Sequence, residues 1–273
     1  MVKHINEVEY TIFDTETTGL EPQFGDRIIE IAAIKLKNNA QRETFHSLVN
    51  PQRKVSAVAY QINHISDEML KLAPTIEKVL PRFLEFIKGS VLCSYNAGFD
   101  LGFIKNEAKL FNLYLPDDLI VVDILTMARK LLPNIERHSL WFVSSIMDIK
   151  ATQQHRALSD VELTIQVFDK LNVMLKNKGL TDFAQFINLF SLTSGLSSRI
   201  MDEKIAEIQQ AIDLGVKLKI KYFSRSEAEV TERLVTPKEI TQERNREYLV
   251  GYCHLRGEER TFRIDGILHI EVV

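Results

Sequence analysis

The sequence predicts an α/β protein in which a mixed β-sheet is flanked by helices and followed by a smaller α+β domain. Three strand-like segments joined by short turns come first. Strand-like and helix-like segments then alternate to about residue 175, and more strand-like segments follow a Ser/Gly-rich stretch. Consecutive strands with short turns favour antiparallel pairing, whereas strands interleaved with helices favour parallel pairing, so the first sheet should be mixed.

The first three strands are marked by apolar and β-branched residues between turn residues. Residues 10–13 are a short apolar run that ends at Asp14, residues 27–37 (RIIEIAAIKLK) are rich in isoleucine, and residues 44–49 end at an Asn-Pro pair. Such segments, separated by Gly, Asn, Asp and Pro, are typical of an antiparallel meander.

Helical spacing of apolar residues begins after this meander. Ser66 or Asp67 is expected to cap a short helix, and Pro74 opens a longer one that ends near Gly89. The rest of the first domain is predicted as a strand at 91–95, a helix at 100–111, a strand at 119–122, and helices at 138–147 and 159–175.

Residues 177–199 are predicted to link a domain at 1–176 to a domain at 200–273. An apolar helical stripe at 183–190 precedes the Ser/Gly-rich stretch, and its two interpretations are packing against a domain and a partner-binding helix. Beyond the linker, the pattern predicts a helix at 200–214 and strands at 217–223, 248–254 and 260–264, which favours an α+β or barrel-like fold.

The composition excludes several classes of protein. Hydrophobic residues make up 45% and charged residues 26%, as in globular proteins, and no apolar run approaches the roughly 18–20 residues of a membrane span. The polar N-terminus does not look like a secretory signal. Cys93 and Cys253 lie in apolar segments and are interpreted as buried thiols of a cytoplasmic protein, without a Cys/His zinc pattern. The net charge of −3 argues against extended duplex binding but does not exclude an enzyme that acts at nucleic-acid ends.

The first candidate site lies where the first strand ends in Asp14 and Glu16. One intervening residue places both side chains on the same face of a strand, where they can share a cation. Adjacent carboxylates resist ionising together unless a metal lies between them, and oxygen ligands favour Mg²⁺ or Mn²⁺ over Zn²⁺. An isolated Asp-x-Glu pair is more often a polar strand end, but the following TTGL at 17–20 makes this one more specific.

Two further segments carry acidic residues at the beginning of helices. The segment NAGFD ends at Asp100, and HRALSD runs from His155 to Asp160. Taken singly, Asp100 and Asp160 would be capping or first-turn acids, and His155 would be an exposed loop residue. Taken together, they add two carboxylates and a proton acceptor to the candidate site.

In order and spacing, these three segments resemble the DEDDh (DnaQ-like) 3′→5′ exonucleases, the group that includes proofreading epsilon subunits of bacterial replicative polymerases. The resemblance covers about residues 8–172 and implies a ribonuclease H-like mixed sheet. It implies that His155 takes a proton from the attacking water and that two Mg²⁺ or Mn²⁺ ions are held by Asp14, Glu16, Asp100 and Asp160. The products would be nucleoside 5′-monophosphates released from single-stranded DNA or RNA 3′ ends.

The terminal nucleotide would contact Thr17, Leu20 and Phe99 by hydrogen bonding, wedging and stacking. Leu20 and Phe99 could equally belong to the core. Tyr95 departs from the histidine that many members carry, which could alter substrate contacts but removes no metal ligand.

Residues from about 200 to 273 resemble a WYL domain, an Sm-like barrel module of bacterial regulators. The match departs at Glu247, where tryptophan is usual, and at Gly266, where arginine is frequent. The resemblance implies binding of nucleic acid or a nucleotide-like ligand through a basic surface formed by Lys219, Lys221, Arg233, Arg256, Arg260 and Arg263. The alternative is that these are solvated charges interspersed with Glu227, Glu229, Glu258 and Glu259.

Three functions are therefore in competition. The first is a metal-dependent exonuclease with an appended recruiting or regulatory domain. The second is a nucleic-acid- or ligand-binding regulator with an inert nuclease fold. The intact set of carboxylates argues against this second function. The third is an editing subunit that docks on a DNA polymerase. The sequence does not decide between DNA and RNA, nor does it reveal the oligomeric state or the ligand of the second domain.

Overall fold

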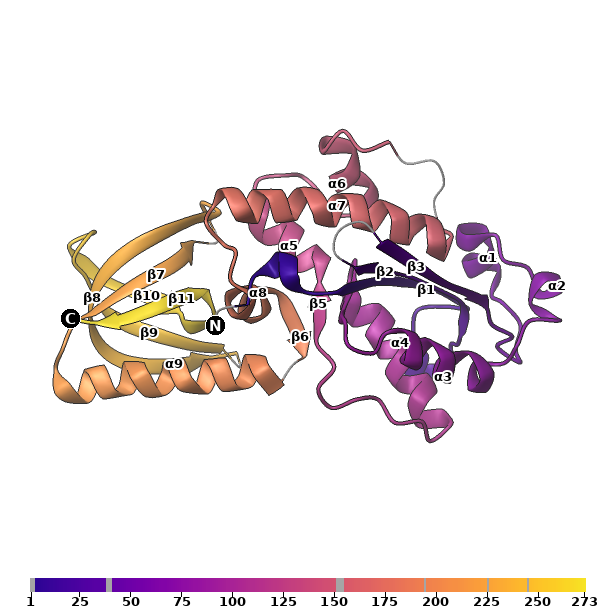
Figure 1. The fold of residues 1–273 in the computed structure, drawn as a ribbon, viewed down its shortest axis with the longest axis horizontal. Coiled ribbons are helices and arrows are strands. Elements are labelled where there is room, and N and C mark those ends of the chain that lie inside the picture. Colours follow the sequence, from indigo (N-terminus) through magenta and orange to yellow (C-terminus); the bar gives the residue numbers. More distant parts are fainter. Residues whose placement is uncertain (1–2, 38–40, 151–154, 194, 225, 245) are drawn as a thin grey trace.

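The computed structural model describes residues 3–37, 41–150, 155–193, 195–224, 226–244 and 246–273, which form two β-sheets (Figure 1). The first sheet has the order β3-β2-β1-β4-β5-β6. Its strands are β1 (Tyr10–Thr17), β2 (Ile28–Lys37), β3 (Gln41–Leu48), β4 (Val91–Ser94), β5 (Val121–Asp123) and β6 (Ser191–Thr193). The pairs β1–β4 and β4–β5 are parallel and the other pairs are antiparallel, so the predicted meander and mixed sheet are confirmed.

The helices of the first half follow most of the predicted positions. They are α1 (Ala57–Asn63), α2 (Asp67–Leu70), α3 (Ile76–Phe86), α4 (Ala97–Leu110), α5 (Ile124–Leu131), α6 (Leu140–Ile146), α7 (Ala157–Asn177) and α8 (Phe183–Phe190). Of the two predicted caps, Ser66 is the one that caps α2, because its side chain accepts the N–H of Met69. The prediction omitted α1 and α5, two short helices, and α4 begins three residues before the predicted start at 100.

The first sheet is buried on both faces, and this arrangement positions the site. Ile12 of β1 belongs to the core that includes α7, whereas its neighbour Phe13 belongs to the core formed with α3 and α4. In Figure 1, α7 runs along one side of the sheet, while α3 and α4 lie on the other. Since side chains alternate along a strand, Asp14 and Glu16 share the α7 side with Ile12.

The second half is an antiparallel sheet packed against a long helix. Its elements are α9 (Gly195–Leu214), β7 (Leu218–Ser224), β8 (Glu229–Glu243), β9 (Arg246–Cys253), β10 (Glu258–Arg263) and β11 (Ile267–Val272). The strand order is β10-β9-β8-β7-β11, and β8 and β11 were not predicted as strands. No pairing among the described residues joins β10 to β11, so the barrel expected from the sequence stays a prediction.

The segment predicted as a linker contains α8, β6 and the beginning of α9. The helix α8 lies between the two halves (Figure 1). Asn188 Nδ2 donates to the carbonyl oxygen of Asp265 at 2.7 Å, and Gln185 Nε2 donates to that of Leu268 at 3.2 Å. Phe183, Phe186, Ile187 and Phe190 of α8 are buried in a hydrophobic core, so the apolar stripe packs within the molecule, while the division into domains stays a prediction.

Both cysteines are buried and free of disulfide bonds, as expected. None of the helices in the described part of the chain is long and apolar enough to span a membrane.

Candidate active site

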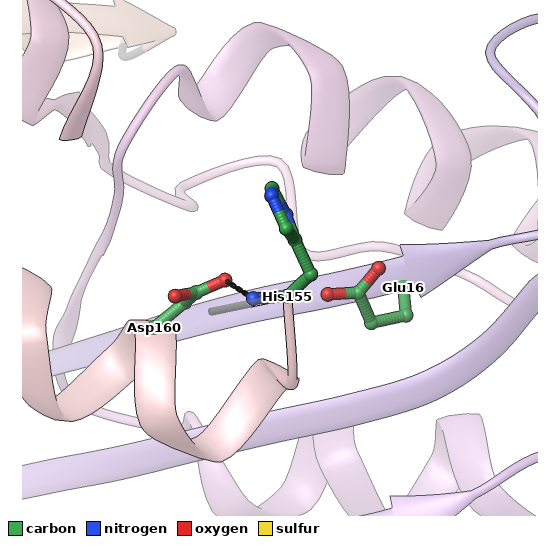
Figure 2. A group of neighbouring side chains, drawn as sticks. All are labelled: Glu16, His155 and Asp160. Carbon is green, nitrogen blue, oxygen red and sulfur yellow. Dashed lines mark hydrogen bonds between the residues drawn. The ribbon is translucent and has the colours of Figure 1, made fainter. Parts of the chain in front are cut away.

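Glu16, His155 and Asp160 meet near the carboxyl end of β1, a central strand of the first sheet (Figure 2). Among the described residues, one ligand atom from each of the three lies within 4.8 Å of the others. Asp160 Oδ2 accepts a hydrogen bond from the backbone N–H of His155 at 3.1 Å. Asp160 Oδ1 is buried and has no hydrogen-bond partner in the described part of the protein. A buried carboxylate oxygen without a partner is unfavourable, so this atom is suited to a cation.

Two elements bring these side chains together. Glu16 and Asp14 project from β1 on the side covered by α7, and α7 carries Asp160 in its first turn. His155 lies just before α7 and has a φ of 54°, in the left-handed region. Its side chain is exposed, so the imidazole is accessible from solvent.

Asp100 approaches from the opposite face of the sheet. It lies in the first turn of α4, after the carboxyl end of β4. Its Oδ1 accepts hydrogen bonds from the N–H and the hydroxyl of Thr15, at 3.0 and 2.7 Å, and its Oδ2 accepts the hydroxyl of Ser94 at 2.7 Å. These bonds attach α4 to both β1 and β4 and hold the Asp100 carboxylate at the end of the sheet.

The acidic residues raise one another's pKa values. Burial, followed by the charges of Asp100, Glu16, Asp160 and Glu30, raises the pKa of Asp14 well above its ordinary value. Burial and neighbouring acids raise the pKa of Glu16 to about 8. Burial raises the pKa of Asp100 to about 6, although hydrogen bonds from Thr15 and Ser94 oppose the shift. Burial also raises the pKa of Asp160.

Such a cluster fits divalent cations. Four neighbouring carboxylates resist ionising together, but their ionised forms are stabilised when a bound cation neutralises their charge. An oxygen-rich donor set suits Mg²⁺ or Mn²⁺. Asp14 and Asp100 are outside the 4.8 Å group but close enough for their charges to act on each other. The geometry thus unites Glu16, Asp160 and His155 most closely, with Asp14 and Asp100 beside them.

The three predicted substrate contacts have different environments. Leu20 is 75% exposed and is free to contact a ligand. The hydroxyl of Thr17 donates to the carbonyl oxygen of Gly19. Phe99 packs against the core of α3 and α4, with its ring 5.0 Å from that of Phe103. Their roles toward a nucleotide stay predictions.

Sequence reasoning missed two residues beside the carboxylates. The Asn63 side chain donates to the carbonyl oxygen of Thr17 at 3.4 Å and, through a hydrogen bond, partly offsets the raised pKa of Glu16. Glu30 lies opposite Glu16 in the β1–β2 register. Burial alone would raise the pKa of Glu30, but hydrogen bonds from Arg156, His46 and Ala157 hold it below its ordinary value. The available signal for Glu30 was one acid within the apolar run IIEIAAI.

A separate cavity of about 360 Å³ lies in the second half of the chain. Of the six predicted basic residues, those that line it are Arg233, Arg256, Arg260 and Arg263. Three of them contact acids: Arg256 Nη2 lies 3.9 Å from Glu227 Oε1, and Arg260 and Arg263 pair with Glu258 and Asp265. Arg233 is only 9% exposed, and no ion pair of its guanidinium is found among the residues that the structure describes.

Two families match this chain. Residues 11–168 match the RNase_T family, described as "Exonuclease", and residues 203–272 match the WYL domain.

Similar proteins include DNA polymerases. The DNA polymerase III PolC-type of Caldanaerobacter subterraneus subsp. tengcongensis is 33% identical over 258 residues, which are 92% of this chain and 18% of that protein. The PolC-type polymerase of Staphylococcus haemolyticus is 36% identical over 180 residues, covering 66% of this chain and 12% of that protein. This chain therefore spans less than a fifth of the length of either relative.

Solved structures share the fold. The nuclease domain of 3′hExo, a DEDDh family member bound to rAMP, has a TM-score of 0.56 at 18% identity and covers 66% of this chain and 97% of that one. E. coli Exonuclease I in complex with a dT13 oligonucleotide has a TM-score of 0.57 at 16% identity and covers 89% of this chain and 55% of that one. These likenesses confirm the predicted ribonuclease H-like mixed sheet.

Proposed function

Since the chain belongs to the DnaQ-like exonuclease family that its residues 11–168 match, we propose that it hydrolyses phosphodiester bonds at the 3′ ends of single-stranded DNA or RNA. Nucleoside 5′-monophosphates are the products. The observation that carries this proposal is the meeting of Glu16, His155 and Asp160, with a buried carboxylate oxygen that lacks a hydrogen-bond partner in the described structure.

Asp14, Glu16, Asp100 and Asp160 are the proposed ligands of two Mg²⁺ or Mn²⁺ ions. When bound, these cations supply Lewis-acid stabilisation of the charge that develops on the phosphate oxygens. The family uses divalent metals. The burial and mutual charge that raise the pKa values of Asp14 and Glu16 support a metal-binding role for these acids.

His155 is the proposed general base. Its imidazole is exposed beside Glu16 and Asp160, where a water molecule and a phosphate can both approach it. The hydrogen bond from its backbone N–H to Asp160 Oδ2 holds the residue in place while the ring remains able to accept a proton.

The substrate end is proposed to lie over Leu20, with Thr17 and Phe99 beside it. The exposed Leu20 can wedge against the terminal base, while Phe99 stacks on the nucleotide and Thr17 forms a hydrogen bond with it. The solved relatives contain a dT13 oligonucleotide and rAMP, so the proposal includes both DNA and RNA. The similarity to PolC-type polymerases supports a DNA polymerase as a partner.

Digestion of 5′-labelled and 3′-labelled oligonucleotides of DNA and RNA tests this function. With Mg²⁺ or Mn²⁺, 5′-labelled strands should shorten in single-nucleotide steps, and 3′-labelled strands should release labelled mononucleotide at once. EDTA and Asp14→Ala should each abolish both signals. Internal cleavage, or digestion that persists in Asp14→Ala, would overturn the assignment.

A second candidate function is a nucleic-acid- or ligand-binding regulator that acts through the WYL domain. The observation that favours it is Arg233, a nearly buried guanidinium lining the cavity without an ion pair in the described structure. An anion that enters the cavity would satisfy this charge. Arg233→Gln should weaken binding of a fluorescent single-stranded oligonucleotide and reduce its salt dependence. Unchanged affinity would remove the support for this candidate.

A further inference from the structure

Glu30 is a buried acid whose contacts extend beyond the carboxylate cluster. It lies in β2, faces Glu16 across the β1–β2 pairing and is 1% exposed. A carboxylate removed from water needs charged or hydrogen-bonding partners. The identity of those partners indicates what Glu30 holds in place.

The partners of Glu30 come mainly from the beginning of α7. Arg156 Nη2 donates to Glu30 Oε1 at 2.8 Å, and Arg156 Nε donates to Oε2 at 3.2 Å. The backbone N–H of Ala157 donates to Oε2 at 3.0 Å. On the other side, His46 Nε2 lies 2.8 Å from Oε1. Two consecutive residues of the chain, 156 and 157, are thus attached to one buried carboxylate.

These two residues directly follow His155, the proposed general base. His155 has a φ of 54°, which few residues other than glycine adopt and which persists only when neighbouring contacts maintain it. One such contact is the bond from the His155 N–H to Asp160 Oδ2. The other is the Glu30 clamp, defined here as the hydrogen bonds from Arg156 and from the Ala157 N–H to Glu30.

We propose that Glu30 is a positioning residue of the exonuclease: through Arg156 and Ala157 it sets the position of His155 relative to the bound phosphate. This inference rests on the proposed function. Because Glu30 acts on the base and not on the nucleotide, its loss should lower kcat and leave KM nearly unchanged. A displacement of a catalytic group by about 1 Å can cost about 10²-fold in rate.

The chain offers a matched control for Glu30→Gln. Glu107 is also 1% exposed, accepts two hydrogen bonds from Arg27 at 2.8 Å each, and accepts the N–H of Ile28 at 3.2 Å. Its chemistry is the same, but it joins α4 to the start of β2 instead of holding residues next to His155. E30Q should therefore lower kcat by about 10²-fold, whereas E107Q should change kcat by no more than about threefold, with both assayed well below their melting temperatures.

A double-mutant cycle separates positioning from general destabilisation. If Glu30 acts through His155, H155A/E30Q should be no slower than H155A alone, measured on the residual activity of H155A. If the loss of activity in H155A/E30Q instead equals the product of the losses in the two single variants, the inference is overturned. Arg156→Lys provides a second variant with intermediate loss, since lysine keeps the charge but not the two parallel N–H donors. It replaces E30Q if that variant does not fold.

Hydrogen exchange of the metal-free protein gives a readout that is independent of activity. The Ala157 amide should exchange faster in E30Q than in wild type and should be unchanged in E107Q. If the wild-type protein has no exonuclease activity, the proposed function itself is refuted. An active wild type with unchanged E30Q kcat, with equal losses in E30Q and E107Q, or with unaltered Ala157 exchange in E30Q would overturn the role of Glu30 alone.

Discussion

The clustered carboxylates should make the metal-free protein less stable as the pH rises, and Glu16→Gln isolates one contribution. Burial, followed by the charges of Asp160, Glu30 and Asp100, raises the pKa of Glu16 from 4.5 to about 8. An acid with a higher pKa in the folded state binds more protons there than in the unfolded chain. The free energy of unfolding therefore falls as the pH rises from 4.5 to about 8, and the loss is complete above this range.

The size of the effect follows from these two pKa values. One pKa unit corresponds to about 1.4 kcal/mol. Between about pH 5 and about pH 7, Glu16 ionises in the unfolded chain but stays protonated in the folded protein. The free energy of unfolding of wild type therefore falls by about 2.5 kcal/mol over this range, and that of E16Q lacks this decrease. For proteins of roughly this size, 1 kcal/mol moves the melting temperature by about 2–4 °C, which gives a difference of about 5–10 °C.

Thermal unfolding followed by circular dichroism in EDTA measures this difference. E16Q and wild type should melt at similar temperatures near about pH 5, and E16Q should melt at the higher temperature near about pH 7. Added Mg²⁺ should close the gap, because a cation favours the ionised carboxylate of wild type. A gap that does not change with pH, or a metal-free wild type more stable than E16Q near neutral pH, would refute the reasoning.

Three further predictions concern the metal and the substrate end. Asp160→Asn should weaken Mg²⁺ binding at least about tenfold in a calorimetric titration, and unchanged affinity would exclude Asp160 as a ligand. Leu20→Ala should raise KM several-fold while the melting temperature stays constant, since this side chain is exposed. Leu214, which is 65% exposed, gives the control Leu214→Ala, which should change neither quantity. Gly19→Ala should raise KM as well, because a Cβ at Gly19 would lie 2.2 Å from Asp26 Oδ2 and would displace the turn that presents Leu20; a variant with wild-type KM would show that this turn does not position the substrate.

Much of the fold could be predicted from local pattern. The alternation along β1 places Asp14 and Glu16 on one face, because successive side chains of any strand point in opposite directions. The hydroxyl of Ser66 caps α2, and α3 has the helical repeat of apolar residues seen in the sequence. Each of these features depends on residues only a few positions apart.

Other elements have weak local signals. The strand β8 contains β-branched residues, but Pro237 and many charged residues interrupt them, so the local signal for one long strand is weak. Pairing with β7 and β9 stabilises this strand. The helix α5 has eight residues and directly follows a three-residue strand, and Asp123 is both the last residue of that strand and the N-cap of α5, so no turn separates the two elements. Short elements of this kind depend on tertiary packing more than on intrinsic propensity.

The difference between what the sequence predicts and what the folded structure adds is greatest at the candidate active site. The motifs identified the acids and His155, because these residue types and spacings are visible in one dimension. Only the folded chain shows that Glu30 pairs with Arg156, 126 residues away, and that Asp160 Oδ1 is buried without a hydrogen-bond partner in the described structure. The partner of a buried charge depends on which elements pack together, and that packing is determined by contacts between segments distant in the chain.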